Sequence, residues 1–287
     1  MAEYEHTQED NKMNILDMIG NTPLMNIDNV YFKLEMFNPS GSIKDRIALE
    51  MLRSLKPGTQ VVEATSGNTG VSFAMVAAAL KLKCKLYCPS GTSPLKRKMM
   101  LAYGAEVSDC QHTHGEMFFL NNLQDCLDAI KRSAELAPIY LNQFSNPLNV
   151  KAQEKMAFEA WCDLCKGNHF LSWSNAPDAI VAGVGTGGTL MGLHNTFPEA
   201  DVYMVVPVDR IEGICDNVDT PLIPMTLKPN LICVTYLNAT ETAAYLAQRH
   251  GIHCGVSSGA NYFAALTIAR KYKRVLTVLP DSGDRYL

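Results

Sequence analysis

Residues 38–48 read NPSGSIKDRIA and place a lysine directly after a Pro/Gly/Ser turn, where an apolar periodic segment begins. Ser42 is followed three positions later by Asp45, which resembles a capping box, so Lys44 is predicted to lie in the first turn of a helix. The positive end of a helix dipole disfavours a protonated amine and lowers its pKa. Such a lysine is costly on a surface but suited to be a nucleophile, so this segment alone fits either a solvated or a reactive lysine.

Two kinds of segment alternate along the rest of the chain. Apolar, β-branched runs such as TQVVEA (59–64), DAIVAG (178–183) and RVLTVL (274–279) predict buried parallel strands. Runs such as VSFAMVAAAL (71–80) have helical spacing. The alternation predicts an α/β architecture. The irregular, polar segment 138–149 is the candidate crossing between two α/β halves.

The composition is that of an ordinary globular protein, with 287 residues, 47% hydrophobic and 19% charged. A net charge of −4 leaves no basic stripe for nucleic acid. No apolar run approaches the roughly 18 residues that a membrane span needs. The polar, acidic start resembles neither a secretory signal nor a transit peptide. We therefore expect small-molecule partners, no nucleic acid and no membrane.

Nine cysteines, scattered through apolar segments, indicate reduced thiols and a cytoplasmic protein. Cys162, Cys165 and His169 have metal-like spacing, but the sequence has no second cysteine pair to complete such a site, and the segment has a helical pattern. No metal site is expected.

Three turns rich in small residues follow predicted strands: TSGNTG (65–70), GVGTGGT (183–189) and GVSSGA (255–260). Ligands of open α/β sheets gather at such carboxyl ends of strands. Small residues let the backbone approach a ligand, and amides at a helix start suit a carboxylate or a phosphate. For the first turn, a tight turn without a ligand remains an alternative.

The second turn also satisfies G-x-G-x-x-G through Gly183, Gly185 and Gly188, with Asp209 near the end of the next predicted strand. A nicotinamide dinucleotide site is therefore an alternative. It leaves TSGNTG and the lysine turn without a role.

Six segments in this order resemble the cysteine synthase (O-acetylserine sulfhydrylase) and cystathionine β-synthase family of fold-type II pyridoxal-phosphate enzymes. They are IGNTPL (19–24), KLEMFNPSGSIKDR (33–46), EATSGNTG (63–70), GVGTGGT, GVSSGA and LPDSGDRYL (279–287). The resemblance implies a tryptophan-synthase-β-like fold, with two open, twisted, mostly parallel sheets, flanking helices and the cofactor between two domains. Residues 1–36 and 142–287 would form a large phosphate-binding domain, and residues 37–141 a small mobile domain that carries the TSGNTG loop. A homodimer is the family's expectation.

The resemblance also implies residue roles. Lys44 would hold pyridoxal 5'-phosphate as a Schiff base and move the substrate's α-proton, Asn68 would hydrogen-bond the pyridine 3'-oxygen, and Ser282 would face the pyridine nitrogen. The phosphate would be bound by Gly185, Thr186, Gly187, Gly188 and Thr189. The substrate, and above all its carboxylate, would be bound by Thr65, Ser66, Gly67, Thr69, Gln143 and Gly213.

The implied reaction is β-replacement at serine or cysteine derivatives through an aminoacrylate intermediate, most simply that of a cysteine synthase. The chain departs from the family after Gly213 and Ile214, where Cys215 and Asp216 replace a glycine and a small residue. Asp216 could orient water or repel an anionic nucleophile, or point to solvent in a shortened loop.

A cysteine-consuming lyase is therefore the alternative within the family. It would release hydrogen sulfide with water, giving serine, or with another thiol as nucleophile, and Asp216 would assist. A non-catalytic regulator is a remote alternative, against which the retention of Lys44 and Ser282 argues. The leaving group and the nucleophile stay open.

Overall fold

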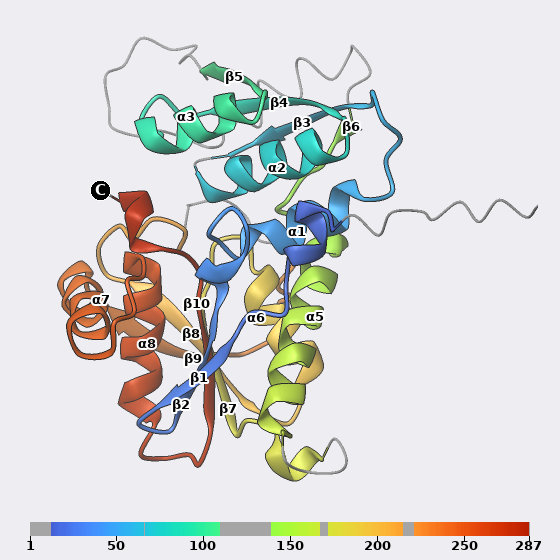
Figure 1. The fold of residues 1–287 in the computed structure, drawn as a ribbon. Helices are drawn as coiled ribbons and strands as arrows, with labels where there is room; N and C mark the ends of the chain where they lie inside the picture. The colour runs from blue at the N-terminus through green and yellow to red at the C-terminus, as the bar shows by residue number, and fades with distance from the viewer. Residues whose placement is uncertain (1–12, 66, 110–138, 167–171, 215–220, 287) are drawn as a thin grey trace, which may run out of the picture.

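In this computed structural model the chain is described over residues 13–65, 67–109, 139–166, 172–214 and 221–286, and it forms two sheets (Figure 1). The large sheet has the strand order β1-β2-β10-β7-β8-β9. Its strands are parallel except that β1 pairs with β2 in antiparallel fashion. They are β1 Leu24–Ile27, β2 Val30–Leu34, β7 Ala179–Gly183, β8 Asp201–Pro207, β9 Asn230–Val234 and β10 Val275–Leu279.

The small sheet has the order β5-β4-β3-β6 and is parallel throughout. Its strands are β3 Gln60–Ala64, β4 Lys83–Cys88, β5 Glu106–Asp109 and β6 Ile139–Tyr140. The predicted strand runs at 59–64, 178–183 and 274–279 become β3, β7 and β10, so these predictions are confirmed. The predicted α/β class, with two mostly parallel sheets, is confirmed as well.

Helices cover both faces of the large sheet (Figure 1). The helices α7 (Tyr236–His250) and α8 (Val256–Ile268) lie on one face, and α5 (Pro147–Leu164) and α6 (Gly188–Thr196) on the other. Each face is closed by its own apolar cluster. All five residues of β10 are buried, as expected for a central parallel strand that is covered on both sides.

The small sheet packs with α2 (Asn68–Ala79), α3 (Pro94–Ala102) and α1 (Lys44–Leu52) around a third apolar cluster. Helix α1 contacts both α2 and α5, so it connects the small sheet to the helical layer of the large one. The remaining short helices are η1 Ile15–Met18, η2 Glu35–Phe37, η4 Trp173–Asn175 and η5 Gly283–Tyr286.

The carboxyl end of the large sheet points toward the small sheet, so the turns that follow β7, β8 and β10 lie near the turn that follows β3 (Figure 1). The segment after β10 strengthens this junction, because Asp281 forms a bridge with Ser42, directly before α1. Within the described part of the chain, we find no helix with the length and apolar character needed to cross a membrane.

Candidate active site

One cavity lies at this junction and brings together most of the residues that the sequence nominated. The predicted residues that line it are Lys44, Thr65, Gly67, Asn68, Thr69, Gln143, Gly185, Thr186, Gly187, Thr189 and Gly213. They come from five separate stretches of the chain, and both sheets contribute. Ser66, Cys215 and Asp216 lie outside the described residues.

Lys44 is the first residue of α1, which confirms that it lies in the first turn of a helix. The predicted capping box is wrong. The N-cap residue is Ile43, and the Asp45 carboxylate accepts hydrogen bonds from the backbone N–H of Ser40, at 2.7 Å, and from the Ser40 hydroxyl. The turn at Gly41, with φ of 85°, folds Ser40 back over the helix start, so Asp45 bonds Ser40 instead of Ser42.

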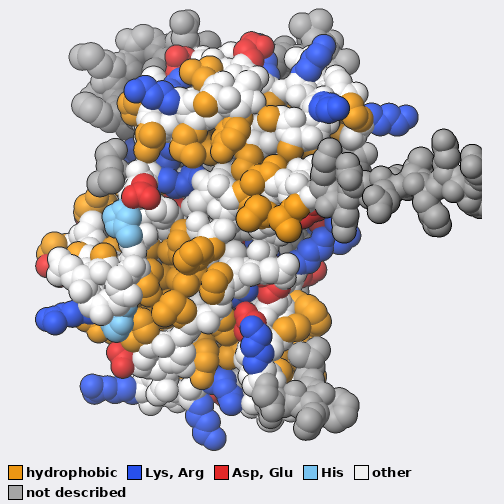
Figure 2. Space-filling model, in the orientation of Figure 1, with side chains coloured by type: hydrophobic (Ala, Val, Ile, Leu, Met, Phe, Trp, Pro, Cys, Tyr) orange, Lys and Arg blue, Asp and Glu red, His pale blue; other side chains and the backbone are white. Residues whose placement is uncertain are grey.

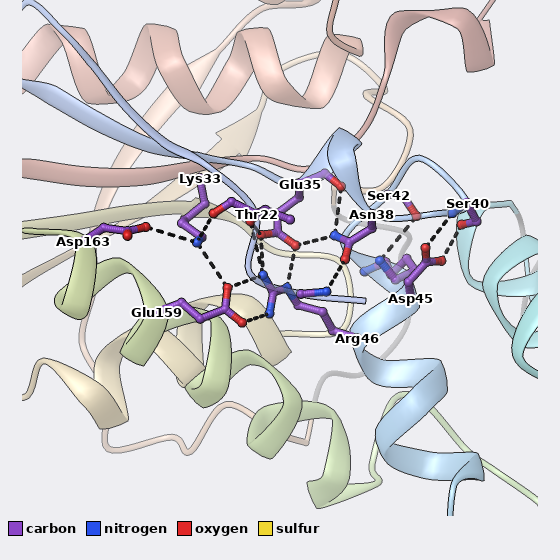
Figure 3. Close-up of polar contacts among 12 residues, drawn as sticks. Thr22, Lys33, Glu35, Asn38, Ser40, Ser42, Asp45, Arg46, Glu159 and Asp163 are labelled. Carbon is purple, nitrogen blue, oxygen red and sulfur yellow. Dashed lines mark hydrogen bonds and ion pairs between the residues drawn. The ribbon is translucent and has the colours of Figure 1, made fainter. Parts of the chain in front are cut away.

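The residues behind Lys44 form a buried ionic network (Figure 3). The Arg46 guanidinium donates to Glu35 at 2.6 and 2.9 Å, and to both oxygens of Glu159 at 2.7 Å. Lys33 lies 3.1 Å from Glu159 and 3.6 Å from Asp163. Burial alone would raise the pKa of Glu159, but the hydrogen bonds from Arg46 outweigh it and lower that pKa. The network fixes α1, and therefore Lys44, to η2 at the end of β2 and to α5.

Hydrogen bonds within the turn that follows β3 stabilise its conformation. The Thr65 hydroxyl accepts hydrogen bonds from the N–H groups of Gly67, at 3.1 Å, and Gly70, at 2.9 Å. The Thr69 hydroxyl donates to Gln143 Oε1 at 2.8 Å, and Gln143 in turn donates to the carbonyl of Ala64. Asn68 and Thr69 open α2, and amides in the first turn of a helix have no acceptor within it. This geometry suits a bound carboxylate.

Glu63, the buried neighbour of this turn, accepts hydrogen bonds from the N–H groups of Ala64, at 2.9 Å, and Gln143, at 3.2 Å. Burial raises the pKa of Glu63 to about 8, against the partial opposition of these backbone donors. No pattern in the sequence singles out this carboxyl.

The glycine turn after β7 leads directly into α6, whose N-cap is Gly187 in the left-handed conformation, with φ of 87°. The Thr186 hydroxyl accepts from Asn149 Nδ2 at 2.9 Å and from the N–H of Gly188 at 3.4 Å. Gly188 itself does not line the cavity. A Cβ there would lie 2.0 Å from Asn149 Oδ1, so this glycine permits close packing behind the turn.

The C-terminal segment differs from expectation. Ser282 does not line the cavity, and its hydroxyl donates to Asp284 at 3.0 Å. Asp281, its neighbour, does line the cavity and is 1% exposed. Burial raises the pKa of Asp281, although hydrogen bonds from Tyr286 and Asn68 oppose the rise.

Hydrogen bonds with Asp281 and Arg285 orient the Asn68 amide. Its Nδ2 donates to Asp281 Oδ2 at 2.6 Å, and its Oδ1 accepts from Arg285 Nη1 at 2.7 Å. The Tyr286 hydroxyl also donates to Asp281 Oδ2, at 2.7 Å. Asp281 Oδ1 is buried and finds no hydrogen-bond partner among the described residues. This oxygen faces Gly255, where a Cβ would lie 2.2 Å from it, so the glycine makes room for the carboxylate.

Asp209, which the dinucleotide alternative requires, lies away from the cavity. Its carboxylate accepts from the N–H of Tyr236 at 3.1 Å, at the start of α7. The alternative therefore loses the acidic residue that would bind a ribose.

Sequence reasoning missed two further groups. Glu212 lines the cavity beside Gly213 and forms an ion pair with Lys96 of α3. The position of Glu212, directly before the nominated Gly213, was the one available signal for it, whereas nothing in the sequence connected Lys96 with residues more than a hundred positions away.

Comparisons with known proteins agree with this site. A family model described as pyridoxal-phosphate dependent enzyme matches residues 15–281. The chain is 32% identical to a cysteine synthase of Aquifex aeolicus, over 100% of this chain and 94% of that protein. It is 34% identical to cysteine synthase B of Campylobacter jejuni, over 95% and 96%.

Solved structures give the same result. A crystal structure of an O-ureido-L-serine synthase superposes with a TM-score of 0.82 at 31% identity, over 96% of this chain and 93% of that one. A hydrogen sulfide-producing enzyme from Fusobacterium nucleatum gives 0.82 at 29% identity, over 96% and 97%.

Proposed function

The chain belongs to the pyridoxal-phosphate dependent enzymes, and from that premise we propose that it catalyses β-replacement at serine or cysteine derivatives, most simply as a cysteine synthase. One observation carries the proposal. Lys44, the 65–70 turn and the 183–189 turn converge on a single cavity, although they lie far apart in the sequence.

The enzyme uses pyridoxal 5'-phosphate, and the residues of the cavity fit it. Thr186, Gly187 and Thr189 surround the start of α6, where backbone N–H groups and hydroxyls suit a phosphate. Lys44 would bind the aldehyde carbon of the cofactor, and the oriented Asn68 amide would bind its pyridine 3'-oxygen. When bound, the cofactor stabilises negative charge that develops at the substrate's Cα.

The chain's own residues then supply binding and proton transfer. The Thr65 and Thr69 hydroxyls, Gln143 and the first amides of α2 would hold the substrate carboxylate. That contact would orient the Cα–H bond toward the amine of Lys44, which would take the α-proton as general base. Ser282 is proposed to lie beside the pyridine nitrogen. In this structure its hydroxyl donates a hydrogen bond to Asp284 instead.

Product analysis tests the proposed reaction. The purified holoenzyme, given O-acetylserine and sulfide, is expected to form cysteine and acetate in equal amounts. If neither this pair nor any other activated serine yields a β-substituted amino acid, the proposal is wrong.

A second candidate is a cysteine-consuming lyase that releases hydrogen sulfide. The likeness to a hydrogen sulfide-producing enzyme supports it, as does the replacement of family small residues by Cys215 and Asp216. Sulfide release from cysteine alone measures this activity. If Asp216→Asn leaves that rate unchanged, Asp216 does not assist the step.

The domain division also stays a proposal, with residues 1–36 and 142–287 in one unit and 37–141 in the other. The membership of the strands in the two sheets supports it, because β1 and β2 join the large sheet while β3 to β6 form the small one. Limited proteolysis that fails to cut near these boundaries would speak against it.

A homodimer in the cytoplasm is likewise proposed. Figure 2 shows hydrophobic side chains gathered over the middle of one face, with charged side chains mostly toward its edges, which suits a protein contact. The six cysteines of the described residues are all free, which suits a reducing compartment. Light scattering that gives the mass of one chain would refute the dimer.

A further inference from the structure

Lys96 is a buried cation that joins the two sheets beside the active site. It lies on α3 of the small sheet, its side chain is 0% exposed, and its ammonium pairs with Glu212. Glu212 lies on the segment after β8 of the large sheet. The same ammonium lies 4.5 Å from the centre of the Tyr286 ring. Lys96, a residue of the small-sheet side, therefore contacts two segments of the large-sheet side: the one after β8 and the one after β10.

This ion pair is in contact with the turn proposed to bind the substrate carboxylate. A Cβ on Gly67 would lie 2.9 Å from Glu212 Oε1 and 3.3 Å from Lys96 Nζ. Gly67 lies between Thr65 and Thr69, and all three line the cavity together with Glu212. An acidic side chain thus stands next to the place of an anionic substrate group.

Two carboxylates at such close range repel each other, and water screens that repulsion only in part, because the Glu212 side chain is 35% exposed. The Lys96 ammonium neutralises the charge of the Glu212 carboxylate and so reduces its repulsion of the substrate carboxylate. Lys96 also keeps the turn against the segment 209–214, because its stem packs on Gly67, 3.1 Å from the position of the missing Cβ.

We propose that Lys96 is a positioning residue for the substrate carboxylate, which acts by neutralising Glu212 and by holding the 65–70 turn in place. The proposal rests on the proposed function, since it assumes that this turn binds an amino-acid carboxylate. It assigns no chemical step to Lys96.

Removal of the cation alone is expected to weaken substrate binding. In Lys96→Met the stem keeps its volume while Glu212 is left as an uncompensated anion beside the substrate. The dissociation constant for O-acetylserine or L-cysteine should rise at least about tenfold, a change of about 1.4 kcal/mol. The kcat should fall less than KM rises, because Lys96 does not reach the reacting atoms.

The double variant Lys96→Met/Glu212→Gln separates charge from packing. It removes the anion together with its partner, so substrate affinity should return to within about threefold of the wild type. Lys85→Met is the matched control, because its ion pair with Glu106, at 2.6 Å, is partly exposed at the edge of the small sheet. That variant should bind substrate as the wild type does.

Affinity is measured by titrating each holoenzyme with substrate and following the cofactor's visible spectrum, with the melting temperature recorded beside it. Unchanged affinity in Lys96→Met overturns the inference. So does a double variant that stays folded, with a normal melting temperature, yet binds as weakly as Lys96→Met. A wild-type protein that responds to no serine or cysteine derivative overturns the proposed function, and the inference falls with it.

Discussion

Lys44 owes its position to the two residues that follow it. Asp45 is bonded to Ser40, and Arg46 lies between the buried Glu35 and the partly buried Glu159 (Figure 3). A long, rotatable side chain loses entropy when it must hold one geometry, so a fixed backbone reduces what its ordering costs. The sequence showed these charges but gave no reason to pair Arg46 with a residue 113 positions away.

Arg46→Met should destabilise the protein markedly. It leaves the carboxylates of Glu35, at 0% exposure, and Glu159 without their guanidinium partner. Breaking a buried pair in this way costs about 3–5 kcal/mol in the free energy of unfolding. Urea unfolding of the holoenzyme measures the loss.

Arg53→Met is the control for that change, because the Arg53 side chain is 49% exposed in its pair with Glu50. Glu50 is only 4% exposed but keeps Lys151 and Lys155 as partners, so the loss of Arg53 should cost no more than about 1 kcal/mol. Equal losses in the two variants would show that the buried network does not fix α1.

Glu63 should make stability depend on pH. Its pKa is raised to about 8 in the folded protein, from an ordinary value of 4.5. Between these values the native state keeps a proton that the unfolded chain has lost, so stability falls as pH rises through this window. Glu63→Gln should remove most of that fall, on the order of a few kcal/mol between pH 5.5 and 8.5.

Chemical denaturation at several pH values measures the slope. The exposed Glu106→Gln variant should keep the wild-type slope. If Glu63→Gln also keeps it, the native carboxyl of Glu63 is not protonated in this range.

At the level of elements, the glycines of α6 permit close packing against α5. Gly192 lies against α5, and a Cβ there would lie 2.4 Å from Gln153 Cβ and 2.6 Å from the Gln153 backbone carbon. Helices that approach so closely need a residue without a side chain at the crossing. The same closeness places the start of α6, and therefore the proposed phosphate cradle, beside Asn149 of α5.

Gly192→Ala should therefore move α6 away from α5. Overpacking of this kind costs about 1–3 kcal/mol, and the displaced cradle should also bind pyridoxal 5'-phosphate more weakly. Thermal unfolding and fluorescence titration of the apoprotein with the cofactor measure the two effects. Asn195→Ala, on the same helix, removes only an exposed hydrogen bond to Glu154 of α5, so it should cost no more than about 1 kcal/mol and leave the cofactor affinity unchanged. Normal cofactor affinity in Gly192→Ala would mean that the cradle does not depend on this crossing.

The elements themselves were largely predictable, because β-branched runs bounded by glycine or proline have few other uses in a chain of this composition. The helix start at Lys44 was also predictable, yet its capping was not. Capping depends on which of two nearby serines the carboxylate of Asp45 reaches, and the left-handed turn at Gly41 decides that. Such a choice is made by backbone geometry and leaves no pattern in the spacing.

At the scale of the molecule, the site consists of turns from two sheets that meet. The order of the motifs was sufficient to nominate the lysine and both ligand-binding turns. It was not sufficient for Asp281, Lys96 or Glu212, whose positions depend on how the segment after β10 and helix α3 lie against the cavity. Residues that meet between the two sheets are not regularly spaced in the sequence, so no sequence pattern predicts their contacts.

Absorption spectroscopy combined with peptide mapping tests whether Lys44 carries the cofactor. The visible spectrum of the purified protein is recorded before and after borohydride, and the reduced protein is digested for peptide mass analysis. We predict a yellow band that reduction removes, and a stable mass increase on the peptide that contains Lys44. Lys44→Ala should show neither. A reducible cofactor bound to another lysine, or a Lys44→Ala variant that retains the band, would contradict the assignment.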